Sequence, residues 1–190
     1  ITCGGGIKNL EMADKLLSKC SDKILINSAA YENPEVLKKI SKVFGQQSLI
    51  LGVDFKKFGE TYNVFVNNGE KKIKQSFKQY INDLKEMSFG EIYLNSIDKD
   101  GTGMGLEYDI LELIPKDFEK PVILSGGCGN AKHISFGIKN YKINAVSTSN
   151  LLNFVGDGLK KCREKLMLEK IDFPKWNIKR LKGLKHFLIK

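Results

Sequence analysis

The sequence is poor in the residues that build metal centres and disulfide frameworks. Among its 190 residues are two histidines and four cysteines, and the cysteines lie far apart without a CxxC pair. Closely spaced cysteines are typical of zinc sites and redox motifs, so we expect reduced cysteines that pack in the interior of a cytoplasmic protein. His133 and His186 have the surroundings of surface residues. We therefore expect no metal and no other cofactor.

Long apolar runs and basic binding motifs are also absent. No stretch approaches the roughly 18 apolar residues of a membrane span, so no membrane partner is expected. The net charge of +9 comes almost entirely from lysine, because only Arg163 and Arg180 are arginines. The lysines are spread along helix-like segments with acidic residues between them, which favours a solvated surface over a nucleic-acid site. A non-catalytic basic binding protein, using the dense basic tail at 170–190, is kept as an outside alternative.

What the sequence does contain is an alternation of short β-branched runs with longer segments of helical period. Six βα units in order imply a parallel sheet that is buried on both faces. The segment 55–72 departs from this pattern and predicts a β-hairpin. The predicted strands are 1–3, 23–27, 49–54, 91–96, 121–126 and 144–149, and the predicted helices are 9–19, 33–44, 73–87, 107–115, 130–140 and 156–169.

Two parts of the sequence resemble each other. The run "ITCGGGIKN" followed by "KILINSAA" is similar to "VILSGGCGN" followed by "NAVSTSNL". Such a repeat suits an α/β protein of the (β/α)8 TIM-barrel class built from two similar halves, while a flavodoxin-like open sheet is the structural alternative. A complete barrel takes about 250 residues. We therefore expect residues 1–169 to be a partial barrel, strands 3 to 8, that lacks the first two βα units.

The chemistry of such a barrel lies at the C-terminal ends of its strands. Each glycine turn can offer backbone N–H groups and a helix N-terminus to an anion, and the next strand adds small polar side chains. One turn is Gly5-Gly6, followed by Asn27 and Ser28, and the other is Gly126-Gly127, followed by Ser149. Two such sites half a barrel apart predict a substrate with a phosphate at each end.

Carboxylates follow two of the predicted strands. Asp54 ends the strand 49–54, where it would face the barrel mouth and serve as a general acid or base. A salt bridge with Lys56 or Lys57 is an equally good interpretation of Asp54. The run "SIDKDGTG" places Asp98 and Asp100 before a glycine-rich stretch, which suits either a site or an Asx-type turn.

Five motifs together resemble the cyclase subunit of imidazole glycerol phosphate synthase, the HisF family. They read "GGGIKN", "SDKILINSAA", "GVDFKK", "GEIYLNSIDKDGT" and "LSGGCGN", and the resemblance runs to residue 168. It implies a barrel that takes ammonia from a glutaminase subunit. The substrate of that family is a bisphosphorylated ribulosyl compound, which is converted to imidazole glycerol phosphate and an aminoimidazole carboxamide ribotide in histidine biosynthesis.

The resemblance also implies roles for individual residues. Asp54 matches one of the two catalytic aspartates, and the other would lie on the missing first strand, so this piece alone is expected to be inactive. Two open sheet edges would also weaken it. The residues that match substrate- and phosphate-binding positions, with the glycines beside them, are Gly5, Gly6, Asn27, Ser28, Asn95, Asp100, Gly126, Gly127 and Ser149.

At the other end of the strands, Lys23 and Glu91 match two members of a charged ring through which ammonia passes, and Asp22 matches a position that faces the glutaminase. Departures at the substrate end keep other functions open. Asn95 stands where the family has threonine, and the loop after Thr102 is longer. A related amidotransferase barrel acting on a surface-polysaccharide sugar is the main alternative, and a sugar-phosphate isomerase is another.

Overall fold

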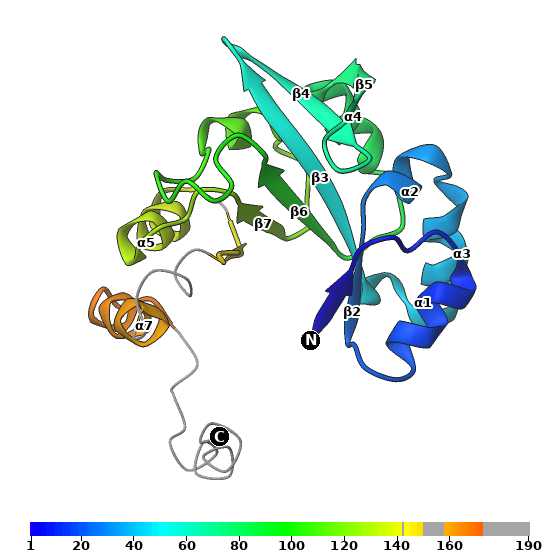
Figure 1. Ribbon diagram of the computed structural model, residues 1–190, viewed down its shortest axis with the longest axis horizontal. Helices are drawn as coiled ribbons and strands as arrows, with labels where there is room; N and C mark the ends of the chain where they lie inside the picture. Colours follow the sequence, from blue (N-terminus) through cyan, green and yellow to red (C-terminus); the bar gives the residue numbers. More distant parts are fainter. Residues whose placement is uncertain (142, 150–157, 173–190) are drawn as a thin grey trace.

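The computed structural model describes residues 1–141, 143–149 and 158–172. Its strands form one curved sheet (Figure 1). The prediction of a partial (β/α)8 barrel is confirmed, because successive strands lie side by side in sequence order and all of these pairs are parallel. A flavodoxin-like sheet would reverse its strand order, so that alternative is wrong. The strands of the curved sheet are β1 (Thr2–Gly4), β2 (Lys23–Ile26), β3 (Leu49–Phe58), β6 (Glu91–Ser96), β7 (Val122–Ser125) and β8 (Ala145–Val146).

The helices lie on the outer side of this arc, with α1, α2 and α3 near one end and α5 and α7 near the other (Figure 1). Their bounds are α1 (Leu10–Leu17), α2 (Ser28–Glu32), α3 (Glu35–Phe44), α4 (Phe77–Leu84), α5 (Ala131–Asn140) and α7 (Gly158–Leu168), with 3-10 turns η1 (Gln46–Ser48) and η2 (Asp109–Leu113). The prediction of an α-helix at 107–115 is wrong, since only the short 3-10 turn η2 forms there.

The insertion after β3 is larger than the predicted hairpin. β3 runs on past Asp54 and pairs antiparallel with β4 (Thr61–Val66), which in turn pairs with β5 (Lys71–Ser76). The predicted helix at 73–87 therefore begins only at Phe77. A capping box explains this start, because the Ser76 hydroxyl accepts from the Gln79 N–H while the Gln79 side chain accepts from the Ser76 N–H.

The two faces of the curved sheet are buried differently. On β2 and β6, the outward side chains of Ile24 and Leu94 are completely buried beneath the helices. The inward side chains of the same strands, such as Leu25, Tyr93 and Asn95, are only partly buried. The larger apolar core thus lies between sheet and helices, while the inner face carries polar side chains such as Asn95 beside apolar ones such as Leu25.

A few expectations about single residues need correction. His133 is half-buried rather than on the surface, and its ring Nδ1 accepts from the Gly129 N–H at 3.1 Å. Cys128 and Cys162 are buried free thiols, but Cys20 is exposed. His186 and the tail from residue 173 onward lie outside the described residues. None of the described helices is long and apolar enough to cross a membrane.

Candidate functional site

The first glycine turn forms one side of an open pocket, here called the first pocket. Gly5 and Gly6 have φ angles of +104° and +69°, which glycine adopts at little cost. The turn leads into α1, which begins with the Asn9 side chain accepting from the Met12 N–H at 2.9 Å. The cavity has a volume of about 620 Å³. The predicted site residues that line it are Gly5, Gly6, Asn27, Ser28 and Asp54.

The second glycine turn repeats this geometry at the other end of the arc and lines what we call the second pocket. Gly126 and Gly127 have φ angles of +90° and +91°, and Asn130 accepts from the His133 N–H at 3.1 Å where α5 begins. The cavity is smaller, at about 170 Å³. The predicted site residues that line it are Asn95, Asp100, Gly126, Gly127 and Ser149.

Asp54 lies between the two pockets and is bonded from both. Asn27 of the first pocket donates from Nδ2 to Asp54 Oδ2 at 2.8 Å, and Asn95 of the second pocket donates from Nδ2 to Asp54 Oδ1 at 3.1 Å. Burial raises the pKa of Asp54 above its ordinary value, against the opposing effect of these two hydrogen bonds, and the negative charge of Asp100 raises it further. A carboxyl group with a raised pKa is suited to exchanging protons with a ligand.

The alternative interpretation of Asp54, a salt bridge with a nearby lysine, is wrong. The Lys56 ammonium lies over the Phe65 ring, 4.9 Å from its centroid. The Lys57 ammonium points to Glu107 and Asp109 at 3.3 and 3.1 Å. The hydrogen bonds of Asp54 come from two asparagine amides and not from these lysines.

Several residues that line the first pocket were not singled out from the sequence, among them two asparagines. Asn67 and Asn68, at the turn between β4 and β5, line the pocket beside Ser28. The Asn67 N–H donates to Ser28 Oγ at 2.8 Å, and its Nδ2 donates to Glu32 at 3.4 Å. Both asparagines have positive φ, which the "NNG" run could have indicated as a turn, but no local signal says which pocket that turn reaches.

The second pocket also contains a phenol that the sequence did not single out. Tyr93 points inward from β6, and its O–H lies 2.7 Å from Ser125 Oγ and 3.4 Å from Ser147 Oγ. Because Tyr93 follows the strand period that also places Asn95 on the inner face, its direction was predictable. Its serine partners, Ser125 at the end of β7 and Ser147 just after β8, were not.

The residues expected at the ammonia entrance lie at the opposite end of the strands. Lys23 at the start of β2 and Glu91 at the start of β6 form an ion pair across β3. Both side chains are partly buried, at 35% and 23% exposure, whereas Asp22 is 81% exposed. The structure therefore separates this charged pair from Asp54 by the length of the strands. Within the described residues, no three His, Cys, Asp or Glu side chains are grouped closely enough to hold a metal ion.

A curled parallel α/β sheet with polar residues gathered at the C-terminal strand ends defines a protein of the (β/α)8-barrel class. Comparison with known families is more specific. Residues 1–154 match the model of the family described as histidine biosynthesis protein, and the chain belongs to that family.

Individual relatives carry the name of one enzyme of that family. The chain is 33% identical over 166 residues to the imidazole glycerol phosphate synthase subunit HisF of Pelodictyon phaeoclathratiforme, covering 87% of this chain and 66% of the relative. It is 37% identical over 155 residues to the HisF subunit of Dictyoglomus thermophilum, covering 81% and 61%. A protein of Parasynechococcus marenigrum, provisionally named as the subunit hisF2, is 40% identical over 164 residues, covering 86% and 61%. The chain thus spans less than two thirds of the length of these relatives.

Proposed function

We propose that this chain supplies most of the active site of an imidazole glycerol phosphate synthase cyclase subunit. The relatives that carry this name support the reaction class. The observation that carries the proposal is the position of Asp54, which receives one hydrogen bond from each pocket. A single elongated substrate that occupies both pockets would pass directly over this carboxylate.

In this proposal each pocket binds one phosphate of the substrate. The N–H groups of the glycine turns and the N-terminal ends of α1 and α5 supply partial positive charge, since helix N-termini attract anions. Ser28 in the first pocket and Ser149 in the second add hydroxyl groups. Because Asp100 lines the second pocket as a carboxylate, we assign it to the hydroxyl groups next to the phosphate rather than to the phosphate itself.

Asp54 would act as the general acid or base during ring formation. Attack of ammonia on a carbonyl carbon and loss of water both require protons to move, and a positioned carboxyl group assists each of these steps. The raised pKa of Asp54 supports this role, because a carboxyl group whose pKa is nearer to neutrality can both give and accept a proton. Asn27 and Asn95 would hold the carboxyl group in one orientation.

Ammonia would reach Asp54 from the far end of the strands, where a glutaminase subunit would bind. The Lys23–Glu91 ion pair lies four residues before Asn27 and Asn95 on the same strands, which is about 13 Å at 3.3 Å per residue. This partly buried ion pair would have to separate to let ammonia pass. The exposed Asp22, which is paired with the N-terminal ammonium of Ile1, would face the partner.

The test uses the complete gene product with the bisphosphorylated ribulosyl substrate and an ammonium salt. We expect turnover, and we expect Asp54→Asn to reduce kcat by about 10²- to 10⁴-fold, the usual contribution of a general acid or base. The matched control is Asp83→Asn, which changes an exposed aspartate on α4 and should leave kcat unchanged.

A second arm of the same experiment replaces the ammonium salt with glutamine and the glutaminase subunit. Turnover that requires both subunits would support ammonia transfer between them. A folded wild-type protein that is inactive in both arms would contradict the proposal and favour an amidotransferase that acts on a sugar. Full activity of Asp54→Asn would instead remove Asp54 from the catalytic group.

A further inference from the structure

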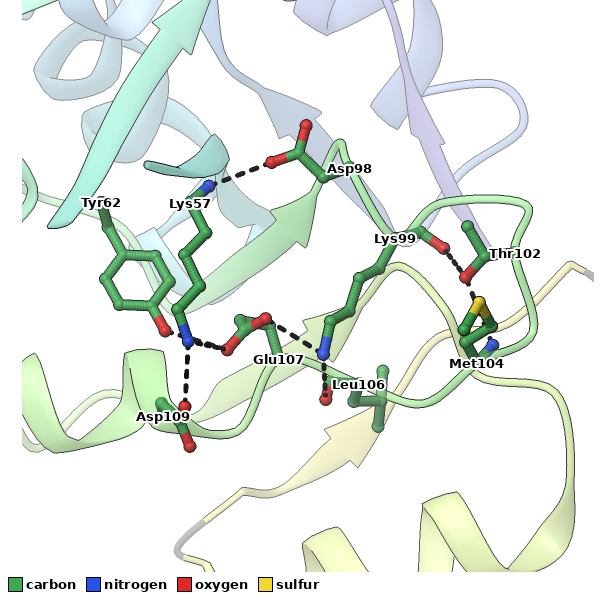
Figure 2. A network of polar contacts seen from close by, with 9 residues as sticks. All are labelled: Lys57, Tyr62, Asp98, Lys99, Thr102, Met104, Leu106, Glu107 and Asp109. Atoms are coloured by element: carbon green, nitrogen blue, oxygen red, sulfur yellow. Dashed lines mark hydrogen bonds and ion pairs between the residues drawn. The ribbon is translucent and has the colours of Figure 1, made fainter. Parts of the chain in front are cut away.

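A buried carboxylate outside both pockets joins the β3–β4 hairpin to the loop that follows β6. Glu107 is 7% exposed and accepts three hydrogen bonds (Figure 2). Its Oε1 accepts from the Tyr62 O–H at 2.9 Å and from Lys57 Nζ at 3.3 Å. Its Oε2 accepts from Lys99 Nζ at 3.0 Å. The donors come from β3, from β4 and from the loop, so one side chain connects both strands of the hairpin to the loop that follows β6.

The network remains charged at neutral pH. Burial raises the pKa of Glu107, but the hydrogen bonds from Lys99, Tyr62 and Lys57 outweigh burial and bring the pKa below its ordinary value. Burial and the hydrogen bond to Glu107 raise the pKa of Tyr62 to about 12. Glu107 is therefore ionised while Tyr62 keeps its proton. Removing the negative charge would leave two partly exposed lysines without the buried carboxylate that binds both of them.

The loop formed by residues 97–106 is attached at both ends. At its start, the Lys57 N–H donates to Asp98 Oδ2 at 3.0 Å, which ties the loop to β3. At its end, the Gly105 N–H donates to the Gly127 carbonyl oxygen at 2.8 Å, and Lys99 Nζ donates to the Leu106 carbonyl oxygen at 3.2 Å. The loop thus bridges the hairpin and the second glycine turn.

The same loop forms a wall of the second pocket. Asp100 and Gly101 lie on it and line that pocket. Packing against the turn is close, since a Cβ atom on Gly127 would lie 2.3 Å from the Gly105 carbonyl oxygen and 2.9 Å from Lys99 Cβ. A movement of Lys99 would therefore move the wall that faces the ligand.

We propose that Glu107 is a positioning residue, which holds the loop 97–106, and with it Asp100, against the second pocket by binding Lys57 of the hairpin and Lys99 of the loop at once. Its effect on the position of the loop follows from the contacts alone, and its effects on phosphate binding and turnover rest on the proposed function. Asp109 provides the contrast. It also accepts from Lys57, at 3.1 Å, but it is 65% exposed and makes no bond to Lys99 in the network of Figure 2.

The experiment compares Glu107→Gln with the matched control Asp109→Asn in the complete gene product. The glutamine side chain has a single acceptor oxygen and no charge, so it can accept from the hairpin donors or from Lys99 but no longer from both at once. Hydrogen–deuterium exchange of peptides from the loop 97–106 should then rise by about tenfold or more, the effect of losing a hydrogen bond between charged groups. Peptides of α1 and the first glycine turn should exchange as in the wild type. In Asp109→Asn, the exchange rates of all peptides should stay within about twofold of the wild-type rates.

Inorganic phosphate gives a second readout that needs no turnover. In Glu107→Gln, the phosphate concentration that protects peptides of the second turn should rise by about fivefold or more, while that for the first turn stays the same. If Glu107→Gln does not fold, Lys99→Gln removes only the loop's side of the contact and should give the same local change. Wild-type exchange and phosphate protection in a folded Glu107→Gln, or a rise spread evenly over the whole chain, would overturn the proposal.

The kinetic consequence separates this proposal from the proposed function. If the cyclase reaction is confirmed, Glu107→Gln should raise KM by about fivefold or more and change kcat much less, since Asp54 is untouched. A complete gene product that lacks cyclase activity would refute the proposed function, but exchange of the loop peptides would still decide the role of Glu107.

Discussion

The two glycine turns are alike in sequence and backbone and differ in what surrounds them. Both have positive φ angles, and both lead into a helix that begins with an asparagine cap. A Cβ atom added at Gly5 or Gly6 would meet nothing within 4 Å, whereas one at Gly126 would lie 2.4 Å from the Ser96 carbonyl oxygen. In the first turn glycine is needed for the backbone conformation. In the second turn it is needed for packing as well.

The difference arises because each pocket takes its remaining wall from a different part of the chain. The first pocket is completed by the Asn67–Asn68 turn of the hairpin, which leaves a cavity of about 620 Å³. The second is completed by the loop 97–106, which packs onto the turn and leaves about 170 Å³. A repeated sequence therefore produced one larger pocket and one smaller pocket.

The largest expected effect that would test this contrast is on stability. Gly127→Ala should lower the free energy of unfolding by about 3 kcal/mol or more, because overpacking adds to the cost of a left-handed residue. Gly6→Ala should lower it by only about 1–2 kcal/mol, the cost of the left-handed conformation alone. Urea denaturation of the complete gene product measures both values.

Gly59→Ala serves as the control for these glycine variants. Gly59 lies between β3 and β4 with a φ of +57°, and a Cβ atom there would also meet nothing within 4 Å. Gly59→Ala should lower the free energy of unfolding by the same amount as Gly6→Ala. Equal losses for Gly127→Ala and Gly6→Ala would show that the two turns do not differ in packing.

A smaller effect is expected on ligand binding in the first pocket. Ser28 Oγ accepts from the Asn67 N–H, so its own hydrogen can be donated to a bound phosphate. Ser28→Ala should raise KM by about tenfold, the value of one hydrogen bond to a charged group, and leave kcat nearly unchanged. Ser41→Ala, at a surface hydroxyl of α3, should change neither parameter. An unchanged KM in Ser28→Ala would indicate that backbone N–H groups alone bind this end of the substrate.

The smallest expected effect concerns the pH dependence of stability through Asp54, which both pockets share. Its pKa in the folded protein lies above the ordinary value of 3.8, so folding favours the protonated form. Well below pH 3.8, Asp54 is protonated in both the folded and the unfolded state, so its ionisation does not lower the free energy of unfolding. As the pH rises toward the pKa of the folded state, the unfolded chain ionises first and stability falls.

Asp54→Asn should remove this pH dependence. Relative to the variant, the wild type should lose about 1.4 kcal/mol for each unit by which the pKa is raised, and the difference should be constant above the pKa of the folded state. Unfolding free energies measured from about pH 3 to 8 provide the test. A wild type that gains stability relative to Asp54→Asn as the pH rises would show that the two asparagines outweigh burial.

Much of the fold and of the candidate site could be predicted because the signals were local. β-branched runs marked β2, β3 and β7, and the glycine turns with their asparagine caps marked the starts of α1 and α5. Asp54 was identified as a carboxylate that follows a buried apolar run, although β3 does not end there but runs on to Phe58. β5 was missed because "KKIKQS" has one apolar residue and reads as the start of a helix. Only its pairing with β4 makes this segment a strand.

The sequence by itself determined the succession of parallel strands, the repeated glycine turns and the placement of polar residues at one end of the sheet, because strand period, turn and cap preferences depend on neighbouring residues. Only the tertiary structure decided that Asn27 and Asn95 bind Asp54, that the Asn67 turn closes the first pocket, and that Glu107 gathers Lys57 and Lys99. These contacts join side chains from separate segments. Which side chains meet depends on how the strands and loops pack, and this packing cannot be read from any local sequence pattern.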